Sequence, residues 1–339
     1  MASYFLRRLL LIIPTFLGVT LMVFAITRFV PGGPVERMIS QAQQMSAQGR
    51  GGGDRVATAA LSESQIQELK EYYGLDKPLL TSYLQWLWKV ARLDLGNSSR
   101  YNEPVWTLIK DRFPVSILFG VSTLLLTYGI CIPLGILKAV KHRAPIDNAT
   151  SALVFIGYAV PNYVIGILLL VLFASHWEFF PLSGLTSSDF SDMSLLAKIR
   201  DLAWHCALPL AAYMAGSFAV TTFLAKNSLM DNLAADYVRT AVAKGLDFRR
   251  AVIRHALRNS LIPIATHFGN EISLILSGSF LVETIFNING FGLLGYESVV
   301  ERDYPVVMGI LVLSSLLFLI GNILSDLCVA FVDPRVKFQ

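Results

Sequence analysis

The sequence predicts an all-α, polytopic membrane protein with six transmembrane helices, and three observations lead to this fold class. Hydrophobic residues make up 54% of the 339 residues, charged residues make up only 15%, and the mean hydropathy is +0.56. Soluble domains usually carry about 25% charged residues. Six apolar segments are long enough to cross about 30 Å of hydrocarbon, which takes about 20 helical residues. Lys and Arg gather in alternate connections between these segments.

The six apolar segments are predicted to be helices because lipid offers no hydrogen-bond partner to an exposed backbone. We place them at 9–30, 115–140, 150–175, 205–229, 266–286 and 305–332. The first is longer than the apolar region of a secretory signal peptide, which has about 7–15 residues, and we therefore expect it to be a retained span. Pro161 lies inside the third segment and is expected to kink or end a helix there.

The distribution of basic residues predicts the orientation of the chain. They lie before the first span, between the second and third, between the fourth and fifth, and after the sixth. Outside the fourth-to-fifth connection they are Arg7, Arg8, Lys138, Lys141, Arg143, Arg335 and Lys337. Because Lys and Arg are enriched in cytoplasmic loops, both termini are predicted to be cytoplasmic.

The chain is accordingly predicted to have three parts. Residues 1–30 form an N-terminal span, 31–114 an extracytoplasmic segment, and 115–339 a core with five spans. Within the second part, the Gln- and Gly-rich stretch 41–60 is predicted to be flexible, and an aromatic-rich helix is predicted around 83–90. This helix is either a lid or partner-docking surface, or an interfacial helix with its aromatic side chains at the lipid headgroups.

The most informative connection is the stretch 236–263, DYVRTAVAKGLDFRRAVIRHALRNSLIP, called the basic elbow below. It is predicted to be a short helix that ends at Gly245, followed by a second helix that begins at Asp247. Glycine adopts the left-handed conformation that ends many helices, and an Asp side chain accepts hydrogen bonds from the free N–H groups of a helix start.

Six Lys and Arg residues make this elbow cationic: Arg239, Lys244, Arg249, Arg250, Arg254 and Arg258. The last three are spaced four residues apart, so they are expected on one face of an α-helix. A folded basic segment between two spans predicts a docking element for another protein. The alternative is a basic loop that only fixes the membrane topology.

Motifs for catalysis are missing from the sequence. It has no GxxxxGK[ST], HExxH or GxSxG, and an intramembrane protease, although an alternative, has no local motif here. Cys131, Cys206 and Cys328 lack CxxC spacing, and the five His residues do not cluster. We therefore expect a non-catalytic chain with no cofactor, no metal site and no nucleic-acid partner.

Four polar side chains within the predicted spans are candidates for the lining of a solute route. They are Glu271, Glu283, Asn322 and Asp326. The alternative is that they form hydrogen bonds between helices or cap helix ends.

The basic elbow resembles the EAA-type loop of binding-protein-dependent ABC importer permeases. Arg239-Thr240-Ala241 stands where Glu-Ala-Ala is common in that family, and Gly245 stands at the motif glycine. The Arg-Thr replacement and the late Pro263 resemble the peptide-type subfamily, whose pattern is YxRTAxAKGL followed by HALRNxxxP.

Other motifs extend the resemblance over nearly the whole chain. They are FLRRLLLIIPTFLGV near the N-terminus, LDLGNS at 93–98, FPLSG at 180–184, ETIF at 283–286, RDYPVV at 302–307 and DPR at 333–335. The chain is most similar to the first permease of dipeptide and oligopeptide importers, and the stretch 41–60 suggests the oligopeptide or microcin C branch. Gly33, where an acidic residue is usual, and Ile288-Asn289, where a proline is common, depart from the pattern and bear on substrate contacts.

The resemblance implies a type I ABC importer permease fold with an extracytoplasmic insertion after the first span. It implies a multi-pass subunit of the bacterial inner membrane that forms half of the pathway for di- or oligopeptides, while a separate subunit hydrolyses ATP. The implied partners are a second homologous permease, two cytoplasmic ATPase subunits, a periplasmic or lipoprotein peptide-binding protein, the peptide and membrane lipid. The stretch 230–263 is then the coupling loop, with the ATPase-coupling residues Arg239, Thr240, Ala241, Lys244 and Gly245.

Two other functions stay open at this point. One is a permease for nickel or another small solute in the same family, which the lack of a His or Cys cluster disfavours. The other is an ion-coupled secondary transporter, which would be expected to contain internal repeats and broken helices at the midplane.

Overall fold

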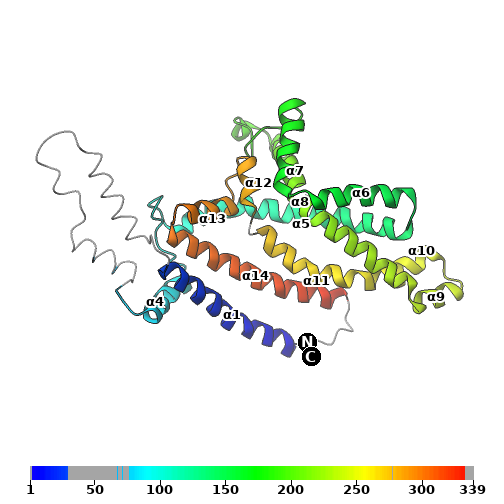
Figure 1. Ribbon diagram of the computed structural model, residues 1–339, viewed down its shortest axis with the longest axis horizontal. Helices are drawn as coiled ribbons and strands as arrows, with labels where there is room; N and C mark the ends of the chain where they lie inside the picture. Colours follow the sequence, from blue (N-terminus) through cyan, green and yellow to red (C-terminus); the bar gives the residue numbers. More distant parts are fainter. Residues whose placement is uncertain (1, 30–66, 68–70, 72–75, 277, 333–339) are drawn as a thin grey trace, which may run out of the picture. The chain divides into compact units, whose positions relative to one another are not determined.

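The computed structural model describes residues 2–29, 67, 71, 76–276 and 278–332. Within this part of the chain the regular elements are helices, which confirms the all-α prediction (Figure 1). The predicted flexible stretch 41–60 and the basic residues Arg335 and Lys337 lie outside the described residues. The chain divides into two compact units. Unit 1 comprises Met1–Leu9, Arg112–Leu294 and Leu316–Gln339, and unit 2 comprises Leu10–Asp111 and Gly295–Ser315.

Among the described residues, four helices are long and apolar enough to cross a membrane, and they correspond to the first, second, fourth and sixth predicted spans. They are α1 (Ala2–Phe29), α5 (Val105–Val140), α8 (Leu195–Ala234) and α14 (Tyr304–Val332). The second and fourth are longer than predicted, because polar turns extend their helices beyond the apolar core.

The third predicted span is a bent pair of helices. It consists of α6 (Pro145–Ala159), α7 (Asn162–Leu169) and the π-helical η2 (Leu170–His176), with a bend of 104° between α6 and α7. Pro161 lies at the bend as the residue before α7, as predicted, because proline lacks the N–H that a continuous helix needs. Counting this pair as one span gives five. A short 3-10 helix, η3 (Phe190–Asp192), follows before α8.

The prediction of one continuous helix over 266–286 was wrong, and six spans are therefore not confirmed. Helix α11 (Leu257–Leu276) ends first, and the short α12 (Phe280–Ile285) begins after a break. At the break Gly278 has a φ of +74° and Ser279 is extended, so the backbone cannot continue as an α-helix.

Helix α8 is the centre of unit 1. It packs against α6, α7, α11 and α12 (Figure 1). One hydrophobic core joins α8 to α5, η2 and α12, and its buried residues include Phe119, Ala212, Tyr213, Val282 and Phe286. Because side chains from four elements fill this core, it fixes the relative placement of those elements.

A close approach of α5 to α8 gives a first prediction. A Cβ atom at Gly135 would lie 2.5 Å from Cβ of Ala225 and 2.9 Å from the carbonyl oxygen of Thr222. Gly135→Ala is expected to lower the free energy of unfolding by about 1–3 kcal/mol, because an added methyl group overpacks the contact. Unfolding in mixed micelles measures it.

Gly129 on the same helix is the matched control, since no atom lies within 4 Å of its added Cβ. Gly129→Ala is expected to leave stability unchanged or to raise it by up to about 1 kcal/mol. Equal effects of the two substitutions would contradict the proposed close contact.

Unit 2 contains α4 (Leu79–Ala91), which confirms the predicted aromatic-rich helix. Helix α4 packs against the unit 2 part of α1 through Tyr83, whose hydroxyl lies 2.9 Å from that of Thr20 and donates to the carbonyl of Leu17 at 3.0 Å. The rings of Phe24, Tyr83 and Trp86 pack together with centroids 5.6–6.0 Å apart.

Unit 2 also brings together two motifs that are far apart in the sequence, LDLGNS and RDYPVV. The hydroxyl of Ser98 donates to the carboxylate of Asp303 at 2.5 Å, and the N–H of Ser99 donates to it at 3.1 Å. Arg100 and the hydroxyl of Tyr101 both contact the carboxylate of Glu297, at 3.2 Å and 2.9 Å. Glu297 lies on α13 (Phe291–Val300), and Asp303 directly precedes α14.

Candidate functional site

The basic elbow begins with α9 (Asp236–Ala243), which ends in the way the sequence predicts. Gly245 has a φ of +89°, its N–H donates to the carbonyl of Val242 at 2.9 Å, and the N–H of Leu246 donates to the carbonyl of Ala241 at 3.1 Å. This pair of hydrogen bonds is the Schellman motif, which requires a left-handed residue at the position of Gly245. The prediction of a helix stop is confirmed.

The second helix of the elbow also begins as predicted. The side chain of Asp247 accepts from the N–H of Arg249 at 3.1 Å and starts α10 (Phe248–Ala251), which continues through the π-helical η4 (Val252–Ala256) into α11. The sequence did not predict the π-helical turn, which lies between Arg250 and Arg258. Arg250, Arg254 and Arg258 are all exposed, and their alignment on one helical face stays a prediction.

The elbow rests on a hydrophobic core of its own within unit 1. Val238 of α9 is buried together with Ala139 of α5, Leu229 of α8 and Ala251 and Ala256 of the following helix. Leu246 packs against this core, as the residue after a Schellman glycine often does. The elbow is therefore a packed continuation of the helices that precede and follow it.

Tyr237 ties α9 to both neighbouring helices. Its hydroxyl donates to the side-chain oxygen of Asn232 on α8 at 2.6 Å and accepts from the side-chain amide of Asn259 on α11 at 3.1 Å. Figure 1 shows α9 at the tip of α8, beside α10. The buried side chain of Val238 and the hydroxyl of Tyr237 together fix the orientation of α9.

The outer face of α9 carries the residues predicted to couple to another subunit. Arg239, Thr240, Lys244 and Gly245 are exposed, and Ala241 is half-buried. The guanidinium of Arg239 forms a 3.8 Å ion pair with the exposed Asp236, and such surface pairs contribute little to stability.

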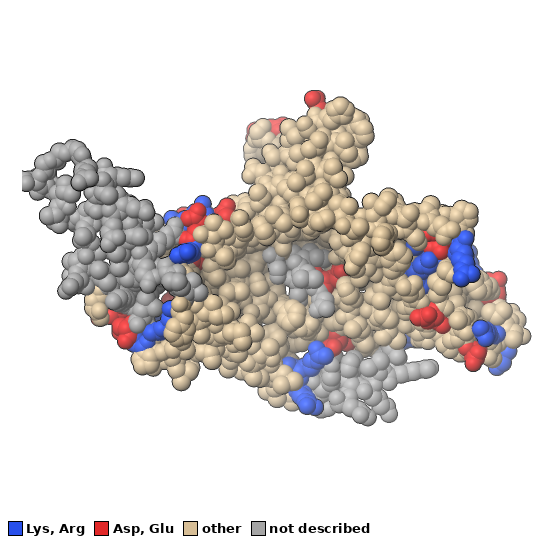
Figure 2. Space-filling view, viewed as in Figure 1, with Lys and Arg blue, Asp and Glu red and all other residues tan. Residues whose placement is uncertain are grey.

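Exposed apolar side chains accompany these groups on the elbow: Val242, Phe248 and Ile253. In Figure 2 charged side chains gather at the end of the molecule that carries α9 and α10, while the flanks of the long helices are largely uncharged. Exposed apolar and cationic residues on a fixed short helix suit a protein–protein contact.

Beneath the elbow lies a buried ion cluster that sequence reasoning missed. The carboxylate of Asp147, on the first turn of α6, accepts from the ammonium of Lys226 at 2.7 and 2.8 Å and lies 3.2 Å from that of Lys138. Lys138 also donates to the hydroxyls of Thr150 and Ser151 at 2.9 and 2.7 Å. This cluster joins the ends of α5, α6 and α8 next to the elbow.

Two lysines in the sequence are signals for this cluster. The charge pattern of the sequence assigns Lys138 to a connection that sets the topology, but the structure places it inside α5 with 1% of its side chain exposed. Lys226 is a charged residue within a predicted span, and such residues usually have a partner in the protein interior. The identity of that partner, 79 residues away, has no local signal.

Three of the four candidate lining residues have partners among the described residues. The carboxylate of Glu271 lies 3.5 Å from the ring of His267, and that of Asp326 lies 2.8 Å from the guanidinium of Arg8. Glu283 accepts from the hydroxyl of Tyr213 at 3.1 Å and from the N–H of Leu293 at 2.5 Å. Asn322 is partly buried on α14. The partners of Glu283 and Asp326 lie on other segments, which agrees with the interhelical alternative. His267 lies on the same helix as Glu271. A lining role stays a prediction for all four residues.

Residues 131–338, which include the ion cluster and the whole elbow, match the family described as "Binding-protein-dependent transport system inner membrane component". This chain belongs to that family. The permease is 43% identical to the "Peptidoglycan transport system permease protein YejB" of Agrobacterium fabrum (strain C58), over 100% of this chain and 99% of the relative.

Two further relatives cover the full length of this permease. It is 33% identical to the "Dipeptide transport system permease protein DppB" of Escherichia coli (strain K12) and 33% identical to the "Oligopeptide transport system permease protein AppB" of Bacillus subtilis (strain 168), each over 100% of both chains. The permease also has the fold of a chain of the MetNI methionine ABC transporter in an inward-facing conformation. That match has a TM-score of 0.52 at 16% identity and covers 67% of this chain and 96% of the other.

Proposed function

We propose that this permease is the membrane-spanning subunit of an ATP-driven importer of peptides or peptide-like solutes. It forms half of the translocation pathway and is non-catalytic. The names of its relatives, which include transporters of dipeptides, oligopeptides and peptidoglycan, support this class of cargo. All these cargoes share peptide bonds and charged ends, which a cavity with hydrogen-bonding side chains can bind.

We further propose that the basic elbow docks on a cytoplasmic ATPase subunit through Arg239, Thr240, Ala241, Lys244 and Gly245. The observation that carries this proposal is the fixed, outward-facing α9, held from below by the buried Val238 and ended sharply at Gly245. A short helix on a rigid base transmits a push from its partner to α5, α8 and α11, because all three pack against it or join it.

The remaining parts of the proposal follow from the family. The complex contains a second, homologous permease, two ATPase subunits and a peptide-binding protein on the opposite side of the membrane. Both termini lie in the cytoplasm. Residues 31–114 lie on the outer side of the membrane, and residues 115–339 form the core of the permease. The joined motifs around Ser98 and Asp303 in unit 2 offer an ordered outer surface to the binding protein.

The docking proposal predicts that bulk on the outer face of α9 uncouples transport. Ala241→Trp and Gly245→Glu are expected to lower ATP-dependent peptide uptake about tenfold or more, because the loss of a central contact costs about 2 kcal/mol. Uptake into proteoliposomes that contain the assembled transporter measures this effect. The amount of permease in the membrane is expected to stay the same.

Two matched controls separate docking from folding. Ala197 is half-buried like Ala241 but lies on the first turn of α8, whereas the elbow follows the last turn of that helix. Ala197→Trp is therefore expected to retain uptake. Gly184 has a φ of +87°, so Gly184→Glu carries a similar backbone strain to Gly245→Glu. Normal uptake by both elbow variants would overturn the proposed docking site.

A further inference from the structure

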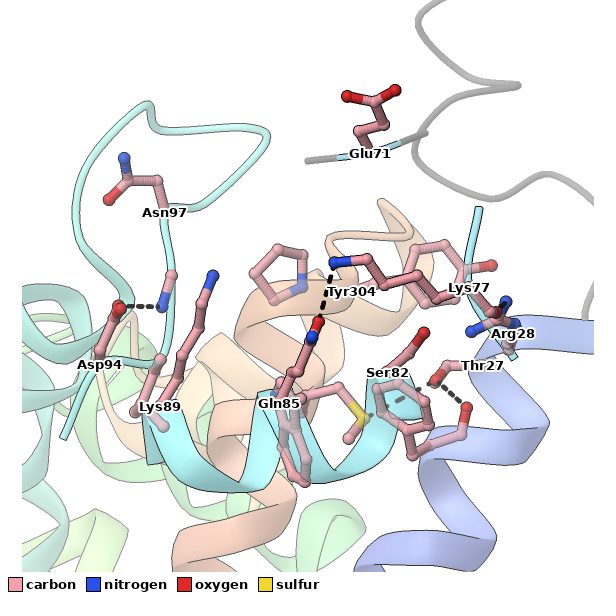
Figure 3. Close-up of a pocket in the computed structure, with 16 residues that line it drawn as sticks. Thr27, Arg28, Glu71, Lys77, Ser82, Gln85, Lys89, Asp94, Asn97 and Tyr304 are labelled. Carbon is pink, nitrogen blue, oxygen red and sulfur yellow. Dashed lines mark hydrogen bonds between the residues drawn. The ribbon is translucent and has the colours of Figure 1, made fainter. Parts of the chain in front are cut away.

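A cavity in unit 2 has no part in the function proposed above. Its volume is about 420 Å³, and it lies among the last turns of α1, helix α4, the loop at 94–97 and the first turns of α14. Figure 3 shows side chains from these elements around it. A cavity of this size accommodates a small polar group together with part of an apolar chain.

Part of the cavity lining is cationic and hydrogen-bonding. Lys77 donates to the side-chain oxygen of Gln85 at 3.1 Å, and Lys89 lies one helical turn after Gln85. In Figure 3 Gln85 and Lys89 rise from the same side of α4. Arg28 also lines the cavity and donates to the backbone carbonyl of Lys77. Three cationic and two acidic side chains, Glu71 and Asp94, line it in all.

The cavity lining also includes four apolar side chains, Phe24, Trp86, Pro305 and Met308. A lining that combines cationic with aromatic and aliphatic side chains suits a ligand that has an anionic group attached to hydrocarbon. Tryptophan is common at this kind of boundary because its ring is apolar while its N–H can hydrogen-bond.

The position of the cavity along α1 points to the source of such a ligand. The candidate membrane span Leu6–Phe29 ends beside Arg28, so the cavity lies at the depth where hydrocarbon gives way to headgroups. The apolar side chains just before it are exposed, 66% for Met22 and 54% for Ile26. They offer a surface for lipid chains.

The outward face of α4 supports the same placement. Leu80, Leu84 and Trp88 follow a four-residue spacing and are 55–62% exposed, while Tyr83 and Val90 on the opposite face are buried. The guanidinium of Arg92 lies 4.6 Å from the ring centre of Trp88. An amphipathic helix with this pattern lies in a membrane interface.

We propose that this cavity binds the phosphodiester headgroup of a membrane phospholipid. Lys77 and Lys89 hold the phosphate, Gln85 hydrogen-bonds beside it, and the acyl chains run along the exposed face of α1. The bound lipid ties α4 to α1 at the membrane surface. A phospholipid headgroup and free inorganic phosphate both carry a phosphate group. The phospholipid differs from free phosphate in its attached acyl chains.

The first test is native mass spectrometry of the delipidated full-length permease. Phosphatidylglycerol and phosphatidylethanolamine are each added, with diacylglycerol as a probe without a headgroup and inorganic phosphate as a probe without chains. The double variant Lys77→Gln/Lys89→Gln is expected to bind both phospholipids at least about tenfold more weakly, since it loses two charge-assisted hydrogen bonds. Lys110→Gln, an exposed substitution on α5 outside the cavity, is the matched control and is expected to bind like the wild type.

Three outcomes of this test would overturn the proposal. They are unchanged phospholipid binding by the double variant, equally tight binding of diacylglycerol, and displacement of phospholipid by inorganic phosphate. Lys77 is half-buried and Lys89 is exposed, so neither contributes much to the packing of the protein. The double variant is therefore expected to keep the wild-type unfolding midpoint in the absence of lipid.

The second test locates the ligand in the assembled transporter. A photoreactive amino acid at position 85 is expected to crosslink phospholipid in vesicles of phosphatidylethanolamine and phosphatidylglycerol, and one at position 110 is expected to crosslink much less. Capture of the peptide-binding protein at position 85, in place of lipid, would overturn the proposal. Neither test depends on the elbow, so failure of one proposal leaves the other standing.

Discussion

Asp147→Ala is expected to lower the free energy of unfolding of the permease by about 3–5 kcal/mol. The carboxylate of Asp147 accepts two hydrogen bonds from the Lys226 ammonium, and only 10% of that lysine side chain is exposed. Without the carboxylate the positive charges of Lys226 and Lys138 would remain buried among α5, α6 and α8. Removal of one partner of a buried ion pair costs far more than the pair itself contributes.

Combined variants test this explanation. Asp147→Asn combined with Lys226→Met and Lys138→Met removes both buried positive charges together with their carboxylate. This triple variant is expected to recover most of the lost stability, because an apolar replacement of a buried ion cluster is often neutral. Asp231→Ala, an exposed acid on the same helix as Lys226, is the control and is expected to change stability by less than about 0.5 kcal/mol.

Unfolding in mixed micelles measures these differences. An Asp147→Ala variant as stable as Asp231→Ala would contradict the structural role of the cluster. Asp147→Ala is also expected to destabilise the basic elbow, since Lys226 lies one turn before Leu229 of the elbow's hydrophobic core.

Glu283→Ala is expected to lower the free energy of unfolding by about 3–5 kcal/mol, because buried hydrogen-bond donors lose the carboxylate that accepts from them. The buried carboxylate accepts from the N–H of Leu293 and the hydroxyl of Tyr213, and the N–H of Gly292 also points to it. Each buried N–H left without a partner costs about 1–3 kcal/mol, and the empty space adds to this.

The carboxylate of Glu283 also explains the glycines around it. A Cβ atom at Gly290 would lie 2.6 Å from the carboxyl carbon of Glu283, so the loop between α12 and α13 can close over this group only with glycine there. The hydroxyl of Tyr213 in turn accepts from the N–H of Ser279. One side chain thus holds the break after α11 and the start of α13.

Hydrogen exchange gives a local measurement of this effect. The amides of Gly292 and Leu293 are expected to exchange at least about tenfold faster in Glu283→Ala, and also in Glu283→Gln, whose amide group turns a donor toward other donors. Glu297→Gln on α13 is the matched control, since Glu297 is about one-third exposed. Unchanged exchange in both Glu283 variants would contradict this role.

The sequence predicted the local structure of the elbow well. The Schellman hydrogen bonds around Gly245 and the cap at Asp247 join residues at most five positions apart, so a short stretch of sequence specifies them. The aromatic helix over 83–90 was predicted for the same reason, as helical periodicity depends on near neighbours.

The broken fifth span marks the limit of that reasoning. Its apolar composition suits a continuous helix, and the break at Gly278 depends on the Glu283 carboxylate and on Tyr213, which comes from another helix. The bent third span was foreseen only in part, because Pro161 indicates a kink but not a bend of 104°. Hydropathy measures composition along the chain, and it carries no information about such contacts.

The sequence by itself determined that this chain is helical, apolar and built around a basic elbow, since these properties depend on composition and on hydrogen bonds between near neighbours. The tertiary structure alone decided which buried charges pair. Asp147 meets Lys226 across 79 residues, and Ser98 meets Asp303 across 205. Such partners are chosen by the packing of helices, because a buried charge must find a compensating group wherever the fold places one.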